Sequence, residues 1–162
     1  MPRVFKATEI ENEEKEVKRD YLDRHMPHVF CPDTVKRGEK FEVKVKLGEE
    51  YPHPDEHAHF ISVIQLWNRE TLLAEARYTA GVYGNKPTHF EIDFYIVAPE
   101  VSMNLSAMAV CTKHGLWQSE DKTVKVEESL KGIVFHKEKG EVSMNKERYD
   151  KFNKEIMESI YR

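Results

Sequence analysis

The sequence predicts an all-β protein, an antiparallel β-sandwich with a helical segment at each end of the chain. Residues 41–47 (FEVKVKL) alternate apolar and charged side chains without a break, which is typical of a strand with one face in water. Further short segments of strand character follow, and turn-forming residues separate them. No long helical pattern lies between them. Short strands joined by loops favour two packed antiparallel sheets.

Residues 8–24 are expected to form the N-terminal helix. The stretch is rich in Glu and Lys, and Thr8 followed by Glu11 fits a capping box. Its apolar positions are sparse, so we expect a surface helix that packs along one narrow stripe. Pro27 should end the helical region and leave His25 in the exit turn.

Five more strands are expected after residues 41–47. They cover residues 59–67, 72–78, 89–97, 103–110 and 123–126. Turns are expected before and after the first strand, at residues 37–40 and 48–50, and later at residues 81–87 and 98–100.

The last part of the chain has a different pattern. A short strand is expected around residues 133–135, and residues 144–161 show apolar side chains at three-to-four spacing with Asn145 as a suitable cap. This apolar stripe can pack on the chain's own sandwich, which we favour, or on a second subunit. The sequence therefore divides into an N-terminal helical segment (1–24), a β-sandwich domain (25–128) and a C-terminal extension with a helix (129–162).

Composition excludes several classes of function. The 162 residues are 33% charged and 40% hydrophobic, which suits one domain with a core of its own. A net charge of −4 gives no electrostatic reason to expect nucleic acid or an anionic membrane as partner. No apolar run approaches the roughly 20 residues that span a bilayer. With two cysteines and no apolar leader at its start, the chain is expected in the cytoplasm without a disulfide framework.

One short segment, residues 111–117 (CTKHGLW), carries a thiol and an imidazole. Cys111 and His114 can face one ion only if the backbone turns between them, and Gly115 supplies a residue free to take positive φ. Trp117 would then cover one side of the site with an apolar wall.

A second segment, residues 51–61 (YPHPDEHAHFI), carries three imidazoles. The two prolines fix an extended backbone around His53, which stands six residues before His59 with His57 between them. Imidazole and thiolate together suit zinc, iron or copper, and they do not suit magnesium or calcium. The two segments therefore predict a metal site.

These motifs resemble the iron-binding domain of the superoxide reductases, the desulfoferrodoxin and neelaredoxin family. His53 and His59 match the two central histidines of the family, and Cys111 and His114 match its final pair. The fourth histidine of the family lies in an N-terminal Glu-Lys-His-x-Pro motif, where this chain has residues 23–27 (DRHMP) and therefore His25. The resemblance covers roughly residues 20–127.

The resemblance implies an immunoglobulin-like sandwich that binds one iron through four equatorial histidines and one axial cysteine, with the sixth position open. The implied activity is the one-electron reduction of superoxide to hydrogen peroxide, with re-reduction by a donor such as rubredoxin. Without a four-cysteine site at its N-terminus, the chain is similar to the single-iron, neelaredoxin-like type. Members of that type often form homo-oligomers, so a tetramer or dimer is expected.

Two residues depart from the pattern of the family, and the resemblance implies catalytic roles for both. Arg24 stands where the family has a lysine, and it keeps a positive charge that can attract the substrate anion. Arginine is a poorer proton relay, because it does not deprotonate. Asp23 stands where the family has a glutamate that can occupy the sixth position of ferric iron, and it is one methylene shorter.

Alternatives exist for individual residues and for the function. His28 lies three residues after His25 and can replace it as a ligand, whereas His57 shares a face with His59 but does not match the family spacing. His89 and His136 are expected in solvent, and Cys31 as a small buried residue or a free thiol. The alternative functions are a non-catalytic metal protein with structural zinc or iron, and a docking module for a redox partner that uses residues 128–162.

Overall fold

A computed structural model describes residues 4–6 and 19–128 of the chain. The chain divides into the units Met1–Leu130 and Lys131–Arg162, and all described residues belong to the first. The predicted C-terminal strand and helix, the helix over residues 8–18 and His136 lie outside the described residues. Among the described residues, no helix has both the length and the apolar character needed to cross a membrane.

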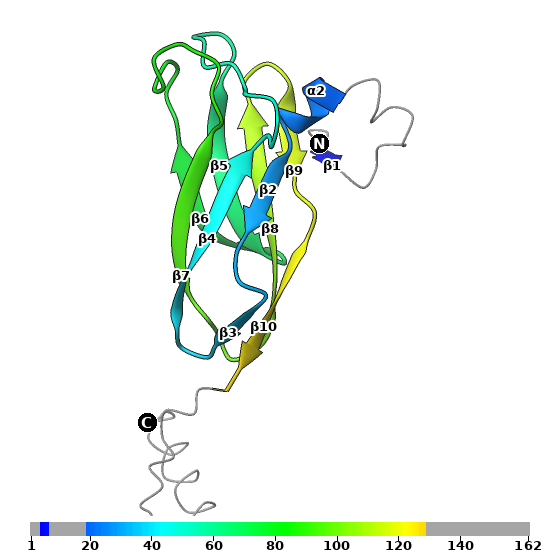
Figure 1. The fold of residues 1–162 in the computed structure, drawn as a ribbon, viewed down its shortest axis with the longest axis vertical. Coiled ribbons are helices and arrows are strands. Elements are labelled where there is room, and N and C mark those ends of the chain that lie inside the picture. Colours follow the sequence, from blue (N-terminus) through cyan, green and yellow to red (C-terminus); the bar gives the residue numbers. More distant parts are fainter. Residues whose placement is uncertain (1–3, 7–18, 129–162) are drawn as a thin grey trace, which may run out of the picture. The chain divides into compact units, whose positions relative to one another are not determined.

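Two β-sheets face each other and form a sandwich (Figure 1). The larger sheet has seven strands, β1 (Val4–Lys6), β3 (Thr34–Lys36), β5 (Ile61–Asn68), β6 (Thr71–Arg77), β8 (Met103–Cys111), β9 (Gly115–Gln118) and β10 (Lys122–Glu127). The smaller sheet has the order β2 (Pro27–Phe30), β4 (Lys40–Leu47) and β7 (Glu91–Val97). The pairs are antiparallel except for β1 with β9 and β3 with β10, which are parallel. The predicted all-β, antiparallel sandwich is confirmed.

The core lies between the sheets and follows from the alternation in sequence. On β4 the inward side chains Phe41, Val43, Val45 and Leu47 are buried, and the charged residues between them are partly or fully exposed. The central strand β8 is buried along most of its length, because β5 lies on one side of it and β9 and β10 lie on the other. The sandwich thereby provides a rigid frame.

The six strands predicted from alternation are present, with ends that differ by at most two residues. Four short strands were not predicted: β1, β2, β3 and β9. Each has three or four residues, which is too few for alternation to be recognised. The helix α2 (Arg19–Asp23) ends just before the exit turn that carries His25.

One end of the sandwich collects the segments singled out in the sequence. In the smaller sheet Pro27 pairs with Leu47, so the start of β2 lies beside the end of β4. In the larger sheet Ile61 pairs with Cys111, so the start of β5 lies beside the end of β8. The turn after α2, the loop 48–60 and the turn 112–114 therefore meet at this end (Figure 1).

Candidate metal centre

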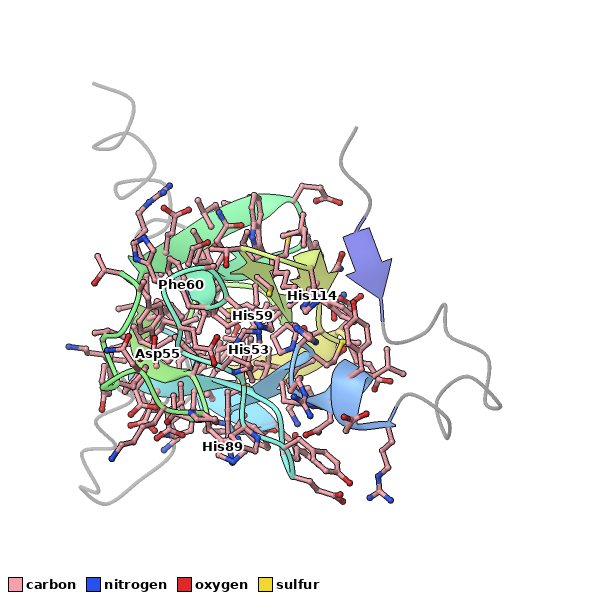
Figure 2. The ribbon with its side chains drawn as sticks, turned by 90° about the horizontal axis from the view of Figure 1, so that it is seen from above. His53, Asp55, His59, Phe60, His89 and His114 are labelled. Atoms are coloured by element: carbon pink, nitrogen blue, oxygen red, sulfur yellow. The ribbon has the colours of Figure 1, made fainter. Side chains whose placement is uncertain are left out.

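Four of the five sequence-predicted metal ligands form one compact group, and the fifth adjoins it. Single donor atoms of His25, His59, Cys111 and His114 all lie within 4.8 Å of one another. The ring of His53 lies beside this group, with its centroid 4.8 Å from the centroids of both His25 and His59. Figure 2 shows His53, His59 and His114 close together near the middle of this end of the sandwich.

The four imidazole rings are arranged as a square. Neighbouring rings have centroids 4.8 Å apart for His25–His53, 4.8 Å for His53–His59, 4.7 Å for His59–His114 and 4.6 Å for His114–His25. Each neighbouring pair is close to perpendicular, with interplanar angles of 74° to 86°. The opposite rings of His25 and His59 are 6.1 Å apart and tilted by only 21°. Within this square, one nitrogen each of His25, His59 and His114 belongs to the donor group that includes the Cys111 sulfur.

Hydrogen bonds to backbone carbonyls fix the orientation of two of these rings. Nδ1 of His25 lies 2.5 Å from the carbonyl oxygen of Tyr21, and Nδ1 of His53 lies 2.7 Å from that of Pro54. A carbonyl can only accept, so each Nδ1 carries the proton and each Nε2 has a free lone pair. Within the described residues, Nε2 of His53 and Nε2 of His59 are buried and have no hydrogen-bond partner.

The backbone around His53 is held in the extended form that its two flanking prolines predict. The N–H of His53 donates to the carbonyl of Thr88 at 2.8 Å, and the N–H of Thr88 donates back at 2.9 Å. The ring packs edge-on against the buried Phe90, with centroids 5.8 Å apart. His53 is fully buried as a result.

A buried carboxylate anchors the same loop, and the sequence analysis did not identify it. Asp55 is fully buried and accepts hydrogen bonds from the N–H of Gly81 at 3.0 Å and of Tyr83 at 2.7 Å. It thus joins the loop of His53 to the turn after β6, and its pairing with distant N–H groups gives no signal in the sequence.

Cys111 lies at the end of β8 and is buried. Its Sγ is 3.6 Å from Nδ1 of His114, and the backbone N–H groups of Lys113 and His114 donate to the sulfur. Burial raises the pKa of the Cys111 thiol, and these two hydrogen bonds act against that rise. Gly115 takes φ +83°, as the turn in this motif requires.

Burial keeps the imidazoles uncharged. It lowers the pKa of His25 to about 4 and the pKa of His53 to about 3, although their carbonyl partners act in the opposite direction. Burial also lowers the pKa of His59 and of His114. Neutral imidazole is the form that binds a metal ion.

The donor set fits a metal ion. Nε2 of His25 and Nδ1 of His114 face each other at 2.8 Å. Two metal–nitrogen bonds of about 2.1 Å at a right angle place their nitrogens about 3.0 Å apart, whereas a tetrahedral angle places them about 3.4 Å apart. The unpartnered nitrogens of His53 and His59 belong to the same group of rings. A cation bound by these nitrogens and by the sulfur of Cys111 would satisfy all of them.

Two aromatic side chains enclose the His25 side of the centre. Trp117 is buried and stacks on the ring of His25, with centroids 4.9 Å apart and an interplanar angle of 17°, which agrees with the predicted apolar wall. Tyr21 packs against His25 at 4.8 Å and edge-on against His114 at 5.2 Å. In the sequence, Tyr21 is one of the sparse apolar positions of the predicted helix 8–24, and nothing there indicates that it contacts these rings.

Asp23 directs its carboxylate to the loop after β4. It accepts hydrogen bonds from the N–H groups of Glu49 at 2.9 Å, Glu50 at 3.0 Å and Tyr51 at 2.8 Å. Partial burial acts to raise the pKa of Asp23, but the three hydrogen bonds outweigh it and the pKa lies below its ordinary value.

Arg24 forms a hydrogen-bonded ion pair within its own segment. Its guanidinium donates to the carboxylate of Asp20 at 2.9 Å and to the carbonyl of the same residue at 2.9 Å. Its positive charge nevertheless acts on the centre, since it contributes to the lowered pKa values of His25, His59 and His114.

The remaining candidates lie away from the square of rings. His28 has Nδ1 4.0 Å from a carboxylate oxygen of Glu49 and is not part of the donor group. His57 is exposed, and His89 lies apart from the three labelled histidines of the centre (Figure 2). Cys31 is a half-buried free thiol.

Comparison with known proteins is consistent with this site. The family model for desulfoferrodoxin matches residues 11–120. A putative superoxide reductase from Methanocaldococcus jannaschii is 35% identical over 104 residues, which are 62% of this chain and 83% of that protein. The superoxide reductase from Pyrococcus furiosus is 28% identical over 110 residues, 60% of this chain and 86% of that protein. The solved structure of a variant of the superoxide reductase (neelaredoxin) from Ignicoccus hospitalis matches with a TM-score of 0.61 and 29% identity, covering 76% of this chain and 94% of that one.

The lowered histidine pKa values predict how the stability of the metal-free protein depends on pH. The unfolded chain binds protons at His25 and His53 near the ordinary pKa of 6.5, whereas the folded protein binds them only near 4 and 3. Between these folded and unfolded pKa values the unfolded state binds more protons than the folded state. The free energy of unfolding should therefore fall as the pH is lowered from 7 to 5. Denaturant unfolding of metal-free protein across this range measures the effect.

A variant gives the control for this prediction. His25→Phe should show a flatter dependence on pH over the same range, and His89→Gln should keep the slope of the wild type. A wild-type stability that does not change between pH 7 and 5 would contradict the burial of neutral imidazoles.

Proposed function

Because the chain belongs to the desulfoferrodoxin family, we propose that it is a superoxide reductase whose iron is bound by His25, His53, His59, His114 and Cys111. The observation that carries the proposal is the square of four imidazole rings with the Cys111 sulfur beside it. The relatives supply the reaction, since the protein of Pyrococcus furiosus is a superoxide reductase and that of Methanocaldococcus jannaschii a putative one.

The donor set supports a redox centre over a structural zinc site. Structural zinc is almost always bound by four ligands in a closed tetrahedron. Four donors lie in one group here, the ring of His53 adjoins them as a fifth candidate, and the facing nitrogens of His25 and His114 are closer than a tetrahedral angle would place them. Bound in this set, iron would supply the single electron that, with two protons, converts superoxide into hydrogen peroxide.

The chain's own residues then have separate tasks. The carbonyls of Tyr21 and Pro54 hold the rings of His25 and His53 in the tautomer that leaves Nε2 free. The N–H groups that donate to the Cys111 sulfur withdraw negative charge from it and thereby tune the potential of the centre. Trp117, which is buried, keeps water from the His25 side.

Two cations near the centre favour the approach of an anion. Arg24 contributes to the lowered pKa values of His25, His59 and His114, and Lys113 contributes to those of His59 and His114. We assign both residues the task of raising the local concentration of superoxide. His59 and His114 are only half-buried, so the anion reaches the centre from their side.

The proposal has further parts. Each chain binds one iron, at this His/Cys group. Residues 25–128 form the iron-binding domain, and an external donor such as rubredoxin re-reduces the iron in the cytoplasm. The protein assembles as a homo-oligomer, a dimer or a tetramer.

Reaction with superoxide tests the proposed function. Reduced, iron-loaded protein should consume superoxide in a pulse-radiolysis experiment at a rate near the diffusional ceiling of about 10⁸–10⁹ M⁻¹ s⁻¹. Each superoxide should yield one hydrogen peroxide and no dioxygen, which separates reduction from dismutation. Cys111→Ser should lose the thiolate-to-iron absorption band and react more slowly, whereas Cys31→Ser should match the wild type. Iron-loaded wild type that consumes superoxide no faster than metal-free protein would refute the assignment.

The electrostatic role predicts how charge and salt affect the rate. Arg24→Ala and Lys113→Ala should each slow the reaction with superoxide several-fold, and together about tenfold, because the anion is attracted less strongly. The difference from the wild type should shrink as salt concentration rises. Lys125→Ala, an exposed lysine on β10, is the matched control and should leave the rate unchanged. Rates in both variants equal to that of the wild type at low salt would remove these residues from the mechanism.

A further inference from the structure

The carboxylate of Asp23 joins two segments that are distant in the sequence. Asp23 is the last residue of α2, and its three hydrogen-bond donors are the consecutive backbone N–H groups of Glu49, Glu50 and Tyr51. Both carboxylate oxygens take part: Oδ1 accepts from Glu49, and Oδ2 accepts from Glu50 and Tyr51. A carboxylate held by three N–H donors has a fixed position and direction.

The loop after β4 also packs closely on this turn through its backbone. The N–H of Gly48 donates to the carbonyl of Met26 at 3.3 Å. Gly48 takes φ +71°, and a Cβ at this position would lie 2.4 Å from the carbonyl oxygen of Tyr51 and 3.3 Å from Oδ2 of Asp23. Only glycine fits there, because a Cβ would collide with the loop's own backbone at Tyr51, and it would also press on Asp23 in the turn.

Each joined segment carries one imidazole of the square. His25 follows Asp23 by two residues, and His53 follows Tyr51 by two residues. Both histidines are fully buried, and their rings meet edge-on with centroids 4.8 Å apart. The hydrogen bonds of Asp23 therefore bridge the backbones on which two neighbouring rings of the centre depend.

We propose that Asp23 is a positioning residue of the metal centre, which ties the segment of His53 to the turn of His25 and does not itself occupy the open metal position. The inference rests on the proposed function, since it assigns a task at the same centre. To reach a metal ion, the carboxylate would have to release the N–H groups of Glu49, Glu50 and Tyr51 together. The chain thus differs from the pattern implied by its resemblance, in which a carboxylate at this place can ligate ferric iron.

Cobalt(II) binding to the metal-free protein tests the positioning role without iron or superoxide. Asp23→Ala should weaken cobalt affinity by about 10–100-fold, the usual effect of removing a residue that orients ligands. Asp23→Asn keeps one oxygen acceptor and should recover part of the loss. Asp93→Asn removes a carboxylate on the outer face of β7 and should bind cobalt as the wild type does. Cobalt affinity that is unchanged in Asp23→Ala would overturn the proposal.

The iron-loaded wild type tests the second half of the proposal, with Asp23→Asn used only to assign a band if one appears. With aspartate labelled by ¹³C at its carboxylate, the infrared difference between oxidised and reduced protein should show no labelled band, because Asp23 keeps its N–H partners in both states. A labelled carboxylate band that shifts on oxidation, and is lost in Asp23→Asn, would show ligation and overturn the inference.

The two hypotheses fail in different ways. Weakened cobalt binding in Asp23→Ala, together with an iron-loaded wild type that does not react with superoxide, would support the positioning role and reject the proposed function. Full superoxide reactivity in the wild type with undiminished cobalt binding in Asp23→Ala would reject the positioning role alone.

Discussion

Four uncharged imidazoles crowd together at one end of the sandwich, and the nitrogens that they bury there constrain the loops around them. A buried nitrogen without a partner costs free energy. Nε2 of His53 and Nε2 of His59 have no partner in the described part of the chain, and Nε2 of His25 faces Nδ1 of His114 at 2.8 Å. A cation bound by these nitrogens removes that cost. The carbonyls of Tyr21 and Pro54 accept hydrogen bonds from Nδ1 of His25 and of His53, so Nε2 of each ring is left free to bind the cation.

The sandwich determines where these rings can lie. The pairing of Ile61 with Cys111 sets the sulfur beside the start of β5, two residues after His59. The rings of His25 and His53 come from irregular backbone. The hydrogen bonds of the Asp23 carboxylate and those between the backbones of His53 and Thr88 hold that backbone in place. Hydrogen bonds thus fix the loop segments that carry His25 and His53, as a preorganised metal centre requires.

Much of this could be predicted from the sequence, for reasons that are local. Alternation identified the six longer strands, because burial on one face repeats every second residue. The P-H-P segment and the Cys-x-x-His turn identified candidate donors, and the resemblance selected His25 over His28, in agreement with the place of His25 in the donor group. Strands of three or four residues, such as β2 and β9, are too short to give a pattern.

What could not be predicted depends on contacts between distant segments. The docking of residues 48–51 on Asp23 joins residues 26 to 28 positions apart, and nothing in either segment alone indicates it. The same holds for Tyr21 against the rings of His25 and His114, and for Asp55, which joins the loop of His53 to Gly81 and Tyr83. The predicted roles of Asp23 and Arg24 came from position in a motif, whereas the side chains have specific partners in this chain.

X-ray absorption spectroscopy at the iron edge, on protein purified with its metal, tests the central claim most directly. The account predicts a first shell of four imidazole nitrogens and one sulfur in the oxidised protein, and loss of the sulfur in Cys111→Ser. A shell without sulfur, or one with only two or three imidazoles, would contradict the claim that the square of rings and the buried cysteine form one metal centre.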